Sequence, residues 1–235
     1  MHIHSSLTSR APNERVMCHK AWEWQTAQVR ARLDAETGAA ARSCDAALLV
    51  QHPPVYTLGR GSLTAHLHFH PSNPPPGSDC VRTDRGGEAT FHGPGQLVLY
   101  PILDLNYHGR DIHEYMRLLE QLVIVSLKDC CGIEAGRMEG LTGVWVDGEK
   151  VAAVGVGMRR WISYHGVALN VCTDLEAFNR IVPCGISDRG VCSVQSILGE
   201  DACPDIGAVA SSMKNAFAAV FGLSLIEKSA EGVPR

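Results

Sequence analysis

The distribution of apolar positions along the chain predicts strands that gather in groups between a few longer helices. The dipeptide Asp147-Gly148 separates two apolar runs and is typical of a tight hairpin turn. Because the strands do not alternate strictly with helices, the pattern favours an α+β fold with a mixed, largely antiparallel sheet flanked by helices. The short apolar runs expected to form strands are residues 46–50, 55–58, 97–103, 143–146, 151–156 and 162–171.

Longer segments have the periodicity of amphipathic helices. Residues 19–36 and 205–221 each carry apolar positions at helical spacing. Between them, Asp111 is expected to be the N-cap of a further helix, with Glu114 three residues later in a start that resembles a capping box. Gly132 is expected to end that helix.

The chain is expected to form one domain after a short leading segment. Residues 1–15 contain no apolar stretch of a secretory signal, so they are expected to be a flexible N-terminus or the remnant of an organelle transit peptide. Residues 16–228 are expected to form a single domain, because the Pro-rich loop at residues 70–78 is too short and too central to separate two.

Composition excludes several classes of partner. The formal net charge of −4 offers no broad basic field for nucleic acid, and no run of about 18 apolar residues predicts a membrane span. The nine cysteines are odd in number and form no C-x-x-C pair, which argues against a secreted disulfide framework. A reducing compartment fits better, with most cysteines buried as small apolar residues.

Four short segments place small residues beside reactive ones. Each also has a structural interpretation: a tight turn, a surface lysine, a histidine bonded in the core, or a buried cysteine. Spacing alone therefore indicates only that a glycine-lined pocket could hold a cysteine, a lysine and one or two histidines. The segments are residues 85–96 with Arg85 and His92, 148–157 with Lys150, 163–171 with His165, and 181–186 with Cys184.

An alternating set of histidines raises the question of a metal. On a strand, His66, His68 and His70 would share one face. The run has no carboxylate partner and adjoins the Pro-rich loop, so we expect no metal site there.

Taken together and in order, these segments resemble the lipoyl(octanoyl) transferase family, and the likeness extends from about Trp22 to Leu198. Residues 21–25 and 160–166 look most like its plastid and cyanobacterial branch. The motifs that carry the resemblance are HPPVYTLG at 52–59, RGG at 85–87 with FHGPGQ at 91–96, TGVWV at 142–146, Lys150 with Gly155, HG at 165–166 with ALN at 168–170, and PCG at 183–185.

The resemblance implies a fold related to lipoate ligases and biotin protein ligases. It implies an acyltransferase in which Cys184 carries the acyl group as a thioester and Lys150 assists as a charge, as a base, or as both. It further implies a substrate site lined by Arg85, Gly86, Gly87, Glu88, Ala89, Thr90, Phe91, His92, Ala153, Val154, Gly155, His165, Gly166, Val167 and Ala168.

The implied donor is octanoyl-acyl carrier protein, whose phosphopantetheine delivers the acyl group without a further cofactor. The implied acceptors are lysines on lipoyl domains of 2-oxoacid dehydrogenase E2 subunits and on the glycine cleavage H protein. We expect a monomer that binds neither nucleic acid nor membrane, in a plastid first, with a bacterial cytoplasm or a mitochondrion as alternatives.

Other functions stay open at this point. One is an ATP-dependent lipoate or biotin ligase of the same fold. Another is a cysteine hydrolase with His92 or His165 as the base, and a third is a non-catalytic module that binds a metal through the alternating histidines.

Overall fold

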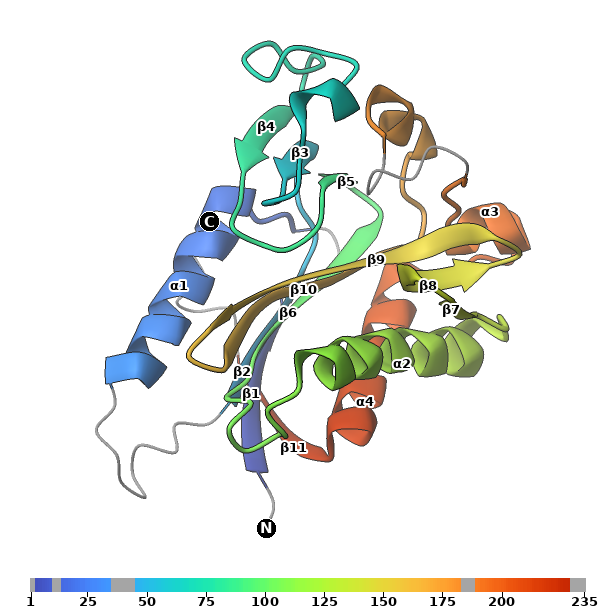
Figure 1. The fold of residues 1–235 in the computed structure, drawn as a ribbon. Coiled ribbons are helices and arrows are strands. Elements are labelled where there is room, and N and C mark those ends of the chain that lie inside the picture. Colours follow the sequence, from blue (N-terminus) through green and yellow to red (C-terminus); the bar gives the residue numbers. More distant parts are fainter. Residues whose placement is uncertain (1–2, 10–13, 35–44, 183–188, 229–235) are drawn as a thin grey trace.

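The structure is a computed structural model and describes residues 3–9, 14–34, 45–182 and 189–228. Its larger sheet contains β1 (Ile3–Ser9), β2 (Asp45–Val50), β6 (Gln96–Ile102), β7 (Gly136–Met138), β8 (Leu141–Val146), β9 (Glu149–Arg159), β10 (Ile162–Asn170) and β11 (Leu223–Lys228). The smaller sheet contains β3 (Val55–Leu58), β4 (Asp79–Arg82) and β5 (Ala89–His92). Strand order is β11-β1-β2-β6-β10-β9-β8-β7 in the larger sheet and β4-β3-β5 in the smaller one (Figure 1).

Helices cover the two faces of the larger sheet. The helices α2 (Ile112–Cys131) and α4 (Ile206–Phe221) pack together on one face, and α1 (Cys18–Asp34) lies on the other (Figure 1). The short α3 (Val194–Leu198) precedes α4 in the chain. Because most neighbouring strands run antiparallel and only β1 pairs in parallel with β2 and β11, the expected mixed, largely antiparallel sheet is confirmed.

Local sequence signals explain where the elements begin and end. The Asp111 carboxylate caps α2 by accepting hydrogen bonds from the N–H groups of His113 and Glu114, and Gly132 ends the helix in the left-handed region. At the hairpin between β8 and β9, Asp147 and Gly148 have φ of 49° and 84°, which matches the predicted two-residue turn.

The N-terminal segment differs from expectation. Part of the predicted flexible segment, Ile3–Ser9, is β1, which lies between β2 and β11 in the larger sheet. Ser5 and Leu7 are buried there, so this part of the leading segment belongs to the sheet of the domain. The physical reason is that both partner strands come from distant parts of the chain, so the local sequence pattern cannot predict this pairing.

The three alternating histidines do not form a strand. Thr64–His66 is a short 3₁₀ helix, His68 bonds the carbonyl of Asn179, and His70 bonds the hydroxyl of Ser72. His66 pairs with the Glu88 carboxylate, so the expectation that the run has no carboxylate partner was wrong for this histidine. The three side chains therefore make separate contacts and do not converge. Within the described ranges, no group of three or more His, Cys, Asp or Glu side chains gathers as a metal site would require.

None of the helices in the described part of the chain combines the length and the hydropathy needed to cross a membrane.

Candidate active site

A pocket opens between α1, the smaller sheet and the central strands of the larger sheet. It holds about 650 Å³ of empty space, including the part that opens to solvent. Its wall along β9 and β10 is made of small residues, since Ala153 pairs with Ala168 and Gly155 pairs with Gly166 across the two strands. Small side chains on adjacent strands leave a slot that an extended apolar chain can fill.

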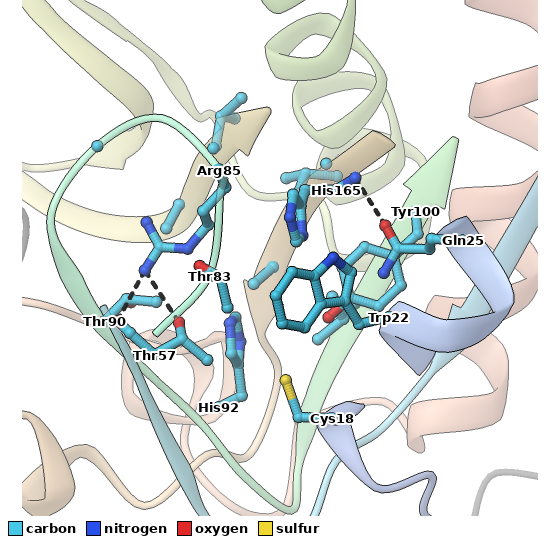
Figure 2. A pocket seen from close by; sticks show the side chains of 18 of the residues that line it. Cys18, Trp22, Gln25, Thr57, Thr83, Arg85, Thr90, His92, Tyr100 and His165 are labelled. Carbon is cyan, nitrogen blue, oxygen red and sulfur yellow. Dashed lines mark hydrogen bonds between the residues drawn. The ribbon is translucent and has the colours of Figure 1, made fainter. Parts of the chain in front are cut away.

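Arg85 forms part of the opposite wall. One terminal nitrogen of its guanidinium donates to the carbonyl and the hydroxyl of Thr57, at 2.8 and 2.9 Å (Figure 2). The other donates to the carbonyl of Gly86 at 3.1 Å. Only 8% of Arg85 is exposed. These contacts hold a fixed positive charge at the edge of the pocket, where it can attract a carbonyl oxygen or an anion.

A network of amides fixes the protonation pattern of His92. The amide nitrogen of Gln96 donates to the Phe91 carbonyl and to the Asn170 side-chain oxygen, so its own side-chain oxygen must accept from Nδ1 of His92 at 2.7 Å. The Asn170 amide nitrogen in turn donates to the carbonyl of Cys192. Since backbone carbonyls can only accept, neither amide can be flipped without losing a bond.

The neutral ring of His92 consequently presents Nε2 as an acceptor. Burial lowers the pKa of His92 to about 3, with a further contribution from the nearby His52. With the proton on Nδ1, Nε2 carries a lone pair, and within the described residues it has no hydrogen-bond partner. His92 lines the pocket, so this lone pair is available to a donor group of a ligand.

His165 is held from two sides. Its ring Nε2 bonds the Asp84 carboxylate at 2.9 Å, and its backbone N–H donates to the side-chain oxygen of Gln25 at 2.7 Å (Figure 2 shows the latter contact). The residue has φ of 57°, an uncommon conformation for a side chain other than glycine. Burial lowers the pKa of His165, whereas the bond from His165 lowers the pKa of Asp84. The two hydrogen bonds hold this ring at the pocket wall and offset the cost of its backbone conformation.

An irregularity between β8 and β9 decides where Lys150 points. Val144 pairs with Ala152, but the next residue, Trp145, pairs with Lys150, so Val151 is an extra residue on β9. This two-against-one pairing is a β-bulge.

The bulge moves Lys150 to the pocket side of the sheet. Side chains along a strand alternate between faces, yet Val151 and Ala152 both pack into the core beneath α2. Lys150 therefore faces the same side as Ala153 and Gly155, both of which line the pocket. Without the bulge, alternation would turn the lysine toward the helices.

Neighbouring backbone makes room for this lysine and fixes it. Gly143 has φ of 120°, and a Cβ there would come within 3.3 Å of the Lys150 Cε and 2.7 Å of the Ala152 carbonyl oxygen. The Lys150 N–H donates to the Gly190 carbonyl, and its own carbonyl accepts from the Cys192 N–H, both at 3.0 Å. Lys150 is only 6% exposed, and it does not line the pocket directly.

The second predicted catalytic residue, Cys184, lies outside the described residues, so its position relative to Lys150 stays a prediction. The described chain borders it closely at Val182 and Arg189. Just beyond, Val191 bridges to Lys150 in parallel. The described residues 190–192 therefore lie beside the end of β9 that carries Lys150.

The pocket collects most of the residues predicted to bind substrate. β5 points Thr90 and His92 inward, while Ala89 and Phe91 face the other way into a cluster of apolar side chains, because side chains alternate along a strand. Gly86 also lies off the pocket wall, where its N–H donates to the Val156 carbonyl. The predicted residues that line the pocket are Arg85, Gly87, Glu88, Thr90, His92, Ala153, Val154, Gly155, His165, Gly166, Val167 and Ala168.

Further lining residues were not predicted as site residues. Gln25 is a buried polar residue on an amphipathic helix, and this mismatch is a signal that the sequence does contain. No such signal marks Cys18 or Tyr100, because only the packing of α1 against β6 brings them to the pocket. The added lining residues are Val98 and, labelled in Figure 2, Cys18, Trp22, Gln25, Thr57, Thr83 and Tyr100.

The mixed sheet, its flanking helices and the pocket between them match one class of catalytic domain in both sequence and fold. The family model of the lipoyl protein ligase A/B catalytic domain matches residues 19–218, and the chain belongs to that family. A lipoate-protein ligase A solved with bound ATP superposes with a TM-score of 0.74 at 16% identity, covering 96% of this chain and 89% of that one. A lipoate ligase described as putative, from T. acidophilum, has a TM-score of 0.70 at 16% identity, covering 96% and 89%. The expected relation to the lipoate-ligase fold is thereby confirmed.

Within that class, the sequence groups with octanoyltransferases. An octanoyltransferase of Synechococcus elongatus is 53% identical over 183 residues, which cover 77% of this chain and 75% of that protein. A chloroplastic octanoyltransferase of Arabidopsis thaliana is 48% identical over 183 residues, covering 76% and 63%. The octanoyltransferase of Thermosynechococcus vestitus is 46% identical over 209 residues, covering 89% and 88%. The protein is an acyltransferase enzyme of the octanoyltransferase family, as the sequence motifs predict.

Proposed function

We propose that the protein transfers an octanoyl group from octanoyl-acyl carrier protein to the ε-amine of a lysine on a lipoyl domain, with Cys184 as the acyl carrier. The observation that supports this most directly is the apolar slot beside Lys150. Ala153 and Gly155 border the slot, and the bulge places Lys150 on the same face of the same strand.

In the first half-reaction, the Cys184 thiolate attacks the carbonyl carbon of the donor thioester. The C–S bond to the phosphopantetheine breaks, and its thiolate leaves and takes a proton. Cys184 then holds the octanoyl group as a new thioester, and because the donor is itself a thioester, no ATP is consumed. A cationic Lys150 favours the attacking thiolate.

In the second half-reaction, the neutral amine of the acceptor lysine attacks the Cys184 thioester. An amide bond forms, the C–S bond breaks, and the amine loses one proton to a base or to water. Cys184 returns as a thiolate. The lone pair on Nε2 of His92 can accept a hydrogen bond from the N–H of a group that reaches the pocket, which helps to orient it.

The slot itself selects the acyl group. Each methylene buried there contributes about 0.8 kcal/mol, so an octanoyl chain gains several-fold in affinity for each carbon it places in the slot.

The described cysteines support the assignment by their environment. Cys18 lines the pocket, but burial raises its pKa to about 11, which leaves the thiol protonated and a poor nucleophile. Burial also raises the pKa of Cys192 to about 12 and that of Cys172 to a smaller extent. A nucleophile for this reaction is therefore better sought elsewhere in the chain, and Cys184 is the motif-based candidate.

The partners follow from the same reaction. The acceptors proposed are lipoyl domains of 2-oxoacid dehydrogenase E2 subunits and of the glycine cleavage H protein, and the octanoyl group is the precursor of lipoyl. A plastid is the proposed compartment because the sequence is similar to those of a chloroplastic relative and several cyanobacterial relatives. A bacterial cytoplasm is compatible with the same relatives.

The test is intact-mass spectrometry after incubation with octanoyl-acyl carrier protein without ATP. We expect the mass of one octanoyl group on the protein, mapped by proteolysis to Cys184, and its transfer when an apo lipoyl domain is added. Cys184→Ala should show neither acylation nor transfer.

Two matched variants serve as controls. Cys18→Ala removes the thiol in the pocket wall, and Cys172→Ala removes an exposed thiol. Both should keep the covalent intermediate. Full transfer by Cys184→Ala, or a strict requirement for free octanoate and ATP, would refute the proposal.

A further inference from the structure

The side chain of Lys150 has an unusual environment for a buried cation. It is 6% exposed, yet within the described residues its Nζ forms no ion pair and no hydrogen bond. Buried lysines are nearly always paired, because an unpaired ammonium loses its hydration without compensation. One contact remains: Nζ lies 4.7 Å from the centre of the Trp145 ring.

Strand geometry makes this contact a fixed one. Trp145 and Lys150 are directly opposed across β8 and β9, and the bulge at Val151 places both on the same face. Trp145 is 4% exposed, so the ring is held by its surroundings. Directly opposed side chains on antiparallel strands lie close enough to interact, and the strand pairing keeps them so in the folded protein.

The tryptophan acts through its ring face. Its indole N–H is buried, and within the described part of the chain it has no hydrogen-bond partner. An indole face is the strongest aromatic site for a cation, and the attraction is largest when water is excluded. Among the described residues, neither side chain forms a hydrogen bond or ion pair that would explain how the two side chains are placed.

We infer that Trp145 is the positioning residue of Lys150: its indole face holds the ammonium at the pocket end of β9 and replaces part of its lost hydration. The inference rests on the proposed function and deepens it, because a lysine held as a cation acts mainly by favouring the Cys184 thiolate. Trp145 does not line the pocket, so it contributes to acyl-enzyme formation and not to substrate affinity.

The test measures the rate of Cys184 octanoylation in single turnovers across pH. Trp145→Phe keeps an aromatic face and should stay within a few-fold of the wild-type rate. Trp145→Leu removes the face and should slow acylation by roughly ten-fold near neutral pH, with an unchanged KM and a pH profile displaced to higher pH. Trp24→Leu removes an indole that packs away from Lys150 and should leave the rate unchanged.

A double-mutant cycle separates positioning from general packing. If Trp145 acts through Lys150, Trp145→Leu should add nothing to the loss caused by Lys150→Ala. An additive loss in the double variant would overturn the inference. So would a Trp145→Phe variant as slow as Trp145→Leu, because that result would assign the effect to the indole N–H.

Fluorinated tryptophans placed at position 145 by codon suppression keep the shape of the ring while depleting the charge on its face. The acylation rate should fall stepwise with each added fluorine. A rate that ignores fluorination would overturn the inference even if Trp145→Leu fails to fold. Absence of any acyl-enzyme in the wild type is a different result: it would overturn the proposed function, and this inference with it.

Discussion

Asn170 connects the pocket wall to the strand segment that carries Lys150, which makes Asn170→Leu an informative perturbation. Its side-chain oxygen accepts from Gln96 at 2.9 Å, and its amide nitrogen donates to the Cys192 carbonyl at 3.0 Å. Asn170 is 4% exposed and Gln96 is 2% exposed, so no solvent can replace either bond. Leucine has a similar volume and cannot bond, so the variant removes the two bonds without creating a large cavity.

The expected loss follows from the two groups left behind. One N–H of Gln96 and the carbonyl of Cys192 each lose a buried partner, at a cost of about 1–3 kcal/mol apiece. The free energy of unfolding should therefore fall by roughly 2–6 kcal/mol. For a chain of this size, that corresponds to a melting temperature lower by about 4–24 °C.

The assay is urea unfolding followed by far-UV circular dichroism, with the slope of the transition checked for constancy. Asn215→Leu is the matched control, since this asparagine is exposed on α4 and its side chain forms no hydrogen bond within the described ranges. It should change the free energy of unfolding by less than about 0.5 kcal/mol. An Asn170→Leu variant as stable as Asn215→Leu would refute the network.

The same variant should also impair acylation more than its stability predicts. Cys192 accepts the Asn170 bond through its carbonyl and donates its N–H to the Lys150 carbonyl. Loosening this segment removes one of the two backbone contacts that hold Lys150. Activity measured well below the melting temperature would show the effect, and a normal rate in a folded variant would limit the role of Asn170 to stability.

Two further predictions concern the pocket. Burial lowers the pKa of His52 to about 4 and that of His92 to about 3, from 6.5. At a pH between each folded-state pKa and 6.5, the unfolded chain binds more protons than the folded chain. The free energy of unfolding should therefore fall as the pH drops below about 6.5, by about 1.4 kcal/mol per pH unit for each histidine. His92→Gln should reduce that slope by about 1.4 kcal/mol per pH unit in urea titrations at successive pH values, and an unchanged slope would contradict the buried neutral histidine. Ala153→Leu should fill the slot and move the preference from octanoyl toward shorter donors by roughly four-fold per displaced methylene, measured as kcat/KM with hexanoyl and octanoyl carrier protein. Equal loss for both donors would place the acyl chain elsewhere.

Elements with strong local signals could be predicted from the sequence. Asp111 and Gly132 mark the two ends of α2 by capping chemistry that needs no tertiary context. The turn at Asp147-Gly148 is equally local. In contrast, the Ser and Thr residues of β1 are typical of an irregular chain terminus, so the strand could not be predicted from them. Its two neighbours in the sheet lie near residues 45 and 223, far away in the sequence.

The candidate site could be predicted in its membership but not in its orientation. Most of the residues that the motifs named line the pocket, because each motif runs along one of its walls. Their role in binding substrate stays a prediction. The motifs included Ala89 and Phe91 as well, since a continuous motif does not distinguish the two faces of a strand. Trp145 was part of a motif, yet its contact with Lys150 depends on the pairing of β8 with β9.

The extra residue at Val151 sets the phase of the strand. Before it, even-numbered residues of β9 face the pocket side, and after it odd-numbered residues do, so a single count of residues determines which side of the sheet receives the lysine. Adding or removing one residue in this stretch would turn the Lys150 side chain toward the helices on the other face of the sheet. Adding or removing two residues would return the side chain to the pocket face but shift its position along the strand. Enzymes with this sheet should therefore tolerate substitutions around Val151 more readily than insertions or deletions. An engineered transferase built on this sheet must preserve the number of residues in this stretch as strictly as it preserves the lysine.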